Sequence, residues 1–145
     1  MSGVGKSRRV SKHLGMPVVS VDDFLTGNRR YIEGIDYNRL ASVVRVTPQP
    51  MVIEGCCLLE VAKRLGEVVD LHVYVRRVTE HGFWHDRDVG EGEMLEYVIR
   101  HNRTVARAAQ VGFSNLDRDL ALYHAEFRPY RSADLVLDLV ERPAD

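Results

Sequence analysis

The chain alternates between short β-branched runs and longer segments whose apolar residues recur at helical spacing. The runs "PVVSV", "MVIEG", "VVDLHVYV" and "ADLVLDLV" predict strands at 17–21, 51–55, 68–75 and 133–140. Helical spacing predicts helices over 7–14, from Asp36 through Leu40, Val43 and Val44, and over 58–65, 93–110 and 116–126. Strands that alternate with helices predict an α/β fold, with a parallel sheet covered by helices on both faces.

Helix caps and breakers support these boundaries. Gly15 and the nearby Pro17 end the first helix, Asp36 is a helix cap, and Gly66 follows the helix over 58–65. The segment 26–35 is rich in Gly, Asn and Arg and predicts a loop. No repeat or linker divides the chain, so we expect one domain over residues 1–145.

Composition narrows the classes of function. The chain has 145 residues, 45% of them apolar and 28% charged, and a formal net charge of -1. This charge gives no general attraction to nucleic acid or to an anionic membrane, and no apolar run reaches the ~20 residues of a membrane helix. We therefore expect a cytoplasmic protein with neither partner. Cys56 and Cys57 are adjacent, which is poor geometry for a disulfide and predicts reduced thiols.

Polar residues follow three of the predicted strands. Asp22, Glu54 and Arg76 each come at the end of an apolar run. In parallel α/β sheets, ligands bind outside the carboxyl ends of the strands. These residues are therefore the first candidates for a site.

The N-terminal residues "GVGKS" match the second half of a phosphate-binding loop. In G-x-x-x-x-G-K-[ST], backbone N–H groups and a helix N-terminus hold phosphates, the lysine reaches the terminal phosphates, and the hydroxyl holds magnesium. Gly3, Val4, Gly5, Lys6 and Ser7 fit these roles in order, although the first glycine of the pattern would precede Met1. The alternative is a flexible N-terminus that matches the pattern by chance.

From Gly3 to its end, the chain resembles the uridine kinase-like branch of the P-loop small-molecule kinases. The resemblance rests on "SGVGKS", "SVDDF", "GIDYNRL", "VIEGCCLL", "RRV" followed by "DRD", and "PYRSADLVLD". It implies a P-loop sheet, ATP and magnesium as cofactors, and phosphoryl transfer to a hydroxyl of a small molecule, such as a nucleoside or a related sugar compound.

The resemblance also assigns roles to single residues. Asp22, rather than Asp23, would accept the proton of the attacking hydroxyl, and Lys6 and Arg87 would neutralise the transferred group. By the same resemblance, ATP would be bound by Gly3, Val4, Gly5, Lys6 and Ser7, and magnesium by Ser7 and Glu54. The substrate would be bound by Asp22, Asp36 and Tyr37, and residues 76–92 would form a lid.

The chain departs from this family in three places. "TEHGFWH" interrupts the arginines of the lid, and the substrate region between Asp36 and Glu54 is short. The strand before the P-loop, which in this family lies in the middle of the sheet, is absent, so its two neighbours would have unpaired edges. Three explanations stay open: a product that begins upstream of Met1, a strand donated by another chain, or a closed-up sheet without a working loop.

The last explanation defines the alternative function. The chain would then be a non-catalytic, P-loop-derived binding or interaction domain, and a homodimer is the simplest partner for an exposed strand edge. A nucleotide-hydrolysing switch has less support because no N-K-x-D motif occurs.

Other conspicuous residues have two interpretations each. His81 and His85 are a metal pair or part of a solvated loop, and Trp84 stacks on a base or anchors the lid. Tyr31, like Tyr37, could contact a sugar or base. On the helix predicted over 93–110, a basic stripe or an ordinary solvated face is formed by Arg100, Arg103 and Arg107.

Overall fold

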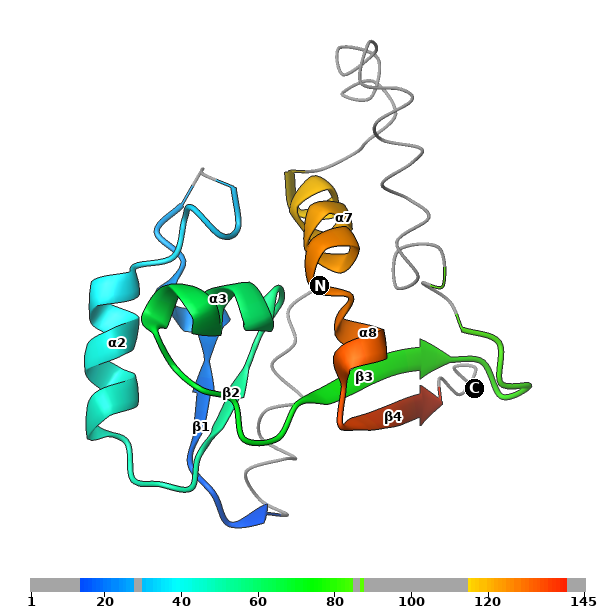
Figure 1. The fold of residues 1–145 in the computed structure, drawn as a ribbon, viewed down its shortest axis with the longest axis horizontal. Coiled ribbons are helices and arrows are strands. Elements are labelled where there is room, and N and C mark those ends of the chain that lie inside the picture. Colours follow the sequence, from blue (N-terminus) through cyan, green and yellow to red (C-terminus); the bar gives the residue numbers. More distant parts are fainter. Residues whose placement is uncertain (1–13, 28–29, 85–86, 88–114, 141–145) are drawn as a thin grey trace, which may run out of the picture. The chain divides into compact units, whose positions relative to one another are not determined.

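The computed structural model describes residues 14–27, 30–84, 87 and 115–140. The chain divides into two compact units, Met1–Gly66 and Glu67–Asp145, here called the N-terminal and C-terminal units. Each is described by itself (Figure 1). The predicted helix over 93–110, and that over 7–14 apart from Leu14, lie outside the described residues.

Two short parallel strands organise the N-terminal unit. Strand β1 covers Val18–Ser20 and β2 covers Val52–Glu54, and their register pairs Val18 with Val52 and Ser20 with Glu54. Both strands fall inside the predicted runs 17–21 and 51–55, so those predictions are confirmed. Directly after β1 the chain turns into a 3-10 helix, η1, over Val21–Phe24. The carboxyl ends of the two strands therefore lie at one edge of the pair.

Helix α2, Tyr37–Val46, has the predicted cap and the predicted stop. The Arg39 N–H donates to Asp36 Oδ1 over 3.0 Å, which satisfies one of the free N–H groups of the first turn. Leu40 and Val44 are buried on one face. The helix ends before "TPQP", and the Thr47 N–H donates to the Val43 carbonyl over 3.0 Å.

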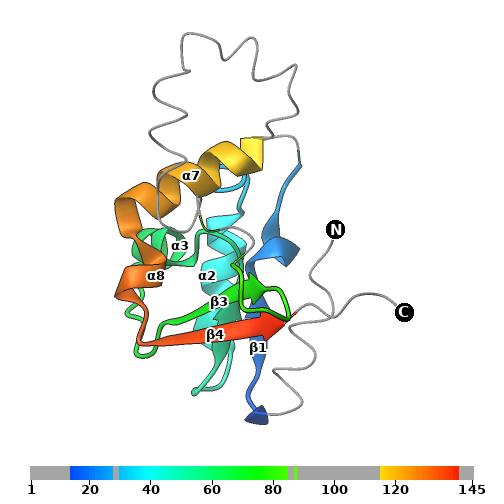
Figure 2. The ribbon, with the colours of Figure 1, turned by 90° about the vertical axis from the view of Figure 1, so that its right-hand side faces the viewer.

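Helix α3 has the predicted bounds, Leu58–Leu65, and lies in front of the β1–β2 pair in Figure 1, a placement that Figure 2 supports from the side. Its buried residues are Val61 and Ala62. Gly66 follows in the left-handed region, with φ 73°, and its N–H donates to the carbonyls of the last turn. Only glycine adopts this conformation without a steric cost, so Gly66 fixes the end of the helix.

The predicted loop over 26–35 folds back on itself and has a buried interior. An antiparallel bridge joins Leu25 to Ile35, and the Thr26 N–H donates to the Gly34 carbonyl over 2.8 Å. Tyr31, Ile32 and Ile35 are all buried. The predicted loop is therefore also a packed part of the unit.

The C-terminal unit contains a second parallel pair. Strand β3, Val73–Val78, pairs along its whole length with β4, Leu135–Val140. Helices α7, Asn115–Phe127, and α8, Pro129–Ser132, lie on one side of this pair (Figures 1 and 2). The predictions of a helix over 116–126 and a strand over 133–140 are confirmed.

The prediction of a strand over 68–75 is confirmed only in part, because strand β3 covers Val73–Val78 and Arg76 does not follow its end. Residues 67–72 are not in a strand, and Val68 is 86% exposed. The His72 N–H instead donates to the side chain of Asp134 over 2.7 Å, and the Asp134 N–H donates to the His72 carbonyl over 2.9 Å. Pairing with β4 therefore sets the start of β3, and Arg76 lies inside the strand.

One face of the β3–β4 pair is exposed and mainly aliphatic, with Arg77 opposite Leu139 on the same face. Side chains alternate between faces along a strand, and the register places five aliphatic residues on the same face. They are Val73, Val75, Leu135, Leu137 and Leu139, each between 36% and 51% exposed. The opposite face packs against the helices through Tyr74, whose hydroxyl lies 3.1 Å from His124 Nε2.

The sheets differ from the single sheet that the sequence predicts. The described strands form two separate sheets of two parallel strands each. The protein is thus a mixed α/β structure with small parallel sheets. Among the described residues, no helix is both long enough and apolar enough to span a membrane.

Candidate functional site

Asp22 and Glu54 lie at the same edge of the β1–β2 pair. Ser20 and Glu54 are partners in the register, and Asp22 follows Ser20 by two residues, in the first turn of η1. Asp22 is exposed and Glu54 is half-buried. The structure thus brings together two of the three polar residues that the sequence places at strand ends.

Tyr31 connects the two strand ends. Its hydroxyl donates to Asp22 Oδ1 over 2.7 Å and accepts from the backbone N–H of Cys56 over 3.1 Å. The direction of both bonds is fixed, because a backbone N–H only donates and a carboxylate only accepts. We call Asp22, Tyr31, Glu54, Gly55 and the Cys56 N–H the strand-end site.

Gly55 leaves room for this connection. A Cβ atom at Gly55 would lie 2.7 Å from Val21 Cβ and 3.1 Å from the Tyr31 hydroxyl oxygen. Carbon atoms do not approach within 3.0 Å without a shift of the structure. The glycine after Glu54 therefore lets the loop over 26–35 approach β2 closely enough for the Tyr31–Cys56 hydrogen bond.

The two tyrosines of this region are held by different partners. Burial raises the pKa of the Tyr31 phenol well above its ordinary value, and the hydrogen bond to Asp22 adds to this increase. The Tyr37 hydroxyl donates to the Ile32 carbonyl over 3.1 Å, and burial raises its pKa too. The Arg64 guanidinium lies 5.8 Å from the centre of the Tyr37 ring.

From the sequence, Tyr31 is predicted only as a contact to a sugar or base. No local pattern indicates its pairing with Cys56, which is 25 residues away. Asp36, predicted as both a cap and a substrate contact, is the cap of α2; its substrate role stays a prediction, as does that of Tyr37.

Several other predicted site residues are not part of the described N-terminal unit. Gly3, Val4, Gly5, Lys6 and Ser7 lie outside the described residues, so the predicted phosphate loop stays a prediction. Arg87 belongs to the C-terminal unit and is exposed.

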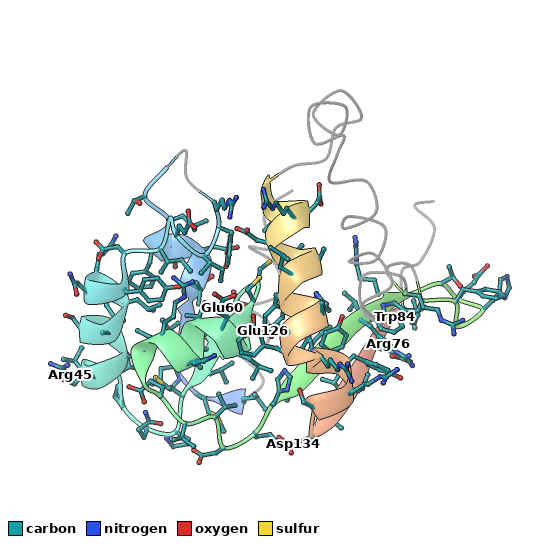
Figure 3. All side chains as sticks on the ribbon, turned by 45° about the horizontal axis from the view of Figure 1, so that its top comes forward. Arg45, Glu60, Arg76, Trp84, Glu126 and Asp134 are labelled. Atoms are coloured by element: carbon teal, nitrogen blue, oxygen red, sulfur yellow. The ribbon has the colours of Figure 1, made fainter. Side chains whose placement is uncertain are left out.

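Arg76 is part of an ion pair, which corrects its predicted place at a strand end. Its guanidinium donates two hydrogen bonds to the Asp138 carboxylate, one of them 3.1 Å long. This hydrogen bonding raises the pKa of Arg76 and lowers that of Asp138. The guanidinium also lies 5.5 Å from the centre of the Trp84 ring and 5.7 Å from that of Tyr130; Figure 3 shows Arg76 beside Trp84.

Trp84 packs within the C-terminal unit. Its ring centre lies 4.8 Å from that of Tyr130 and 6.1 Å from that of Tyr74, and its backbone forms a bridge with Val78. These contacts favour the anchor interpretation over stacking on a base.

The histidines give no metal site in the described part of the chain. His81 is exposed, with Nε2 3.5 Å from Glu80 Oε1, and His85 lies outside the described residues. No group of three or more His, Cys, Asp or Glu side chains suited to a metal occurs among the described residues.

His124 is a buried histidine that the sequence analysis did not single out. Its Nδ1 lies 2.8 Å from the Leu120 carbonyl and its Nε2 3.1 Å from the Tyr74 hydroxyl. A neutral ring that donates from Nδ1 and accepts at Nε2 satisfies both contacts, so His124 links α7 to β3.

Comparison with known proteins gives no match: no family model fits the chain, and neither the curated proteins nor the solved structures contain a similar one at a significant level.

Proposed function

We propose that this protein transfers the γ-phosphoryl group of ATP to a hydroxyl of a small metabolite, in a magnesium-dependent reaction in the cytoplasm. The acceptor class is a nucleoside or a related sugar compound, and the fold is a variant of the P-loop kinase sheet. The observation that carries the proposal is the strand-end site, where Asp22 and Glu54 flank one edge of a parallel pair. Ligands of parallel α/β proteins bind at such edges.

The side chains of the site suit this chemistry. Phosphoryl transfer depends on positioning and charge neutralisation more than on covalent catalysis. Asp22 is exposed, so an acceptor hydroxyl can reach its carboxylate and pass its proton there. Lys6 and Arg87 would supply positive charge to the transferred group.

The oxygen ligands at this edge fit a magnesium ion. Magnesium prefers oxygen and is bound through one or two carboxylates together with substrate phosphates, so a cluster of three side chains is not required. In this proposal Glu54 and Ser7 would hold the ion, and residues Gly3–Ser7 would hold the phosphates of ATP. The ion would neutralise the phosphate charge.

Ligand-dependent melting tests the proposal directly. A ligand at about 100 times its dissociation constant adds roughly 2.7 kcal/mol to stability. We expect millimolar Mg-ATP to raise the melting temperature, and Lys6→Ala to abolish both this rise and the phosphorylation of uridine or cytidine. The matched control is Lys63→Ala, on the exposed side of α3, which should behave as the parent. No shift with Mg-ATP in a cooperatively melting chain would refute the proposal, as would full activity of Lys6→Ala.

A second function has a specific observation in its favour. The five exposed aliphatic residues on one face of β3–β4 are more than scattered surface residues, and contiguous apolar patches mark interaction surfaces. This favours the alternative of a non-catalytic interaction domain, with a homodimer as the simplest assembly. In that case the chain would self-associate in sedimentation experiments, and Mg-ATP would not change its melting.

A further inference from the structure

We propose that Tyr31 is a positioning residue for phosphoryl transfer: its hydroxyl holds the Asp22 carboxylate in the orientation that accepts the proton of the acceptor. This inference rests on the proposed function. It adds to the site a residue from the loop over 26–35, a segment that the family resemblance does not connect with the proton-accepting aspartate.

Tyr31 restricts an otherwise exposed carboxylate. Asp22 is exposed on a short 3-10 helix, where an aspartate would sample several rotamers. The 2.7 Å hydrogen bond from Tyr31 occupies Oδ1. Among the described residues, Tyr31 is the hydrogen-bond partner of this carboxylate, and Oδ2 is left for another donor.

Tyr31 is itself held in place by burial and by two hydrogen bonds. It is 9% exposed, and its hydroxyl oxygen accepts the Cys56 N–H over 3.1 Å. That bond directs the hydroxyl proton toward Asp22, since the oxygen accepts a hydrogen bond from the Cys56 N–H and donates one to the carboxylate. A positioning group must have a locked rotamer to be effective, and Tyr31 meets this condition.

The Tyr31 hydroxyl also links the two strand ends. Asp22 follows β1, and Cys56 follows β2. The Tyr31 hydroxyl bonds to both, so it connects the segment of the proposed proton acceptor with the segment that follows Glu54. Loss of the hydroxyl would free the Asp22 side chain while the apolar packing of the ring stayed in place.

The test compares Tyr31→Phe with the parent in full-length protein, using Mg-ATP and uridine as substrates. We expect kcat to fall about tenfold, because misplacement of a reacting group lowers the rate strongly, while KM for ATP stays within about twofold. Asp22→Asn should lower kcat at least 100-fold, which is in the range of general-base catalysis. In the double variant, Tyr31→Phe should have no further effect, because its role passes through Asp22.

The matched control is Tyr74→Phe, which removes a hydrogen-bonded tyrosine hydroxyl from the C-terminal unit. Its kcat should equal that of the parent. If Tyr31→Phe keeps the parent kcat, or if it lowers kcat equally in the presence and absence of Asp22, Tyr31 is not a positioning residue.

A proton NMR measurement separates this inference from the proposed function. A hydroxyl proton held between Tyr31 and Asp22 should give a slowly exchanging downfield signal that Tyr31→Phe removes and Asp22→Asn shifts. A signal in a chain that shows neither a melting shift with Mg-ATP nor phosphorylation of uridine or cytidine would refute the kinase proposal and leave Tyr31 as a structural bridge only. Absence of the signal in a folded, active parent would overturn the positioning role alone.

Discussion

The two units use the same pattern of parallel strands and helices but distribute their polar residues differently. In the N-terminal unit, apolar side chains such as Leu40 and Val61 are fully buried, and the polar residues gather where the strands end. In the C-terminal unit, the Arg76–Asp138 ion pair lies across the middle of the strands. The strand pair there exposes one mainly aliphatic face.

This difference separates a site from a structural ion pair. Carboxylates beyond the ends of strands stay accessible when they are exposed, as Asp22 is. A charged residue within a strand is held by its cross-strand neighbour, as Arg76 is held by Asp138 and by the rings of Trp84 and Tyr130. Polar residues after an apolar run are therefore candidates for a site only where the strand ends.

The largest expected effect on the free energy of unfolding comes from replacing a buried leucine, and an exposed leucine serves as the comparison. Leu40 is fully buried and Leu137 is 47% exposed. Leu40→Ala should lower the free energy of unfolding by about 2–5 kcal/mol, whereas Leu137→Ala should change it by about 0.5 kcal/mol. Urea unfolding of both variants measures this. Equal losses would mean that the apolar face of β3–β4 is covered in solution, and the contrast between the units would fail.

An intermediate effect concerns Tyr31 at alkaline pH. An unfolded tyrosine loses its proton near pH 10, while the raised pKa keeps Tyr31 protonated in the folded chain. The unfolded state then binds fewer protons, so stability falls as pH rises above about 10, by at most about 1.4 kcal/mol per pH unit from this group.

Denaturant unfolding between pH 8 and 11 measures this effect. Tyr31→Phe should lose less stability than the parent over this range, because it lacks the titrating group. Parallel curves for the two proteins would show that Tyr31 ionises in the folded chain as freely as in the unfolded one.

The smallest expected effect is the pH dependence of the Arg76–Asp138 pair. The pKa of Asp138 is lowered by its hydrogen bonds from Arg76. The pair therefore adds stability above the unfolded aspartate pKa of about 3.9, and this is lost as pH falls through the lower folded value. The Asp138 side chain is 45% exposed, so the contribution is small and screened by salt.

Thermal melting between pH 2 and 6 measures the contribution of this pair. Asp138→Asn should remove this part of the acid dependence, and 0.5 M salt should reduce it in the parent. An Asp138→Asn variant with an unchanged acid profile would contradict the assignment of the lowered pKa to this contact.

The sequence by itself determined most of the local elements. Helix α3 has the predicted bounds because apolar spacing and a C-terminal glycine act within a few residues. The start of α2 follows from Asp36, whose carboxylate accepts an N–H only three residues away. The short strands β1 and β2 follow from β-branched runs, and their polar ends marked Asp22 and Glu54 as site candidates.

Only the tertiary structure decided how these elements pair. Tyr31 meets Asp22 because the loop over 26–35 closes through the Leu25–Ile35 bridge. Arg76 meets Asp138 across 62 residues, and the same strand pairing moves the start of β3 to Val73. Caps and periodicity act within one or two helical turns, whereas these contacts depend on register and chain reversal, which no local pattern encodes.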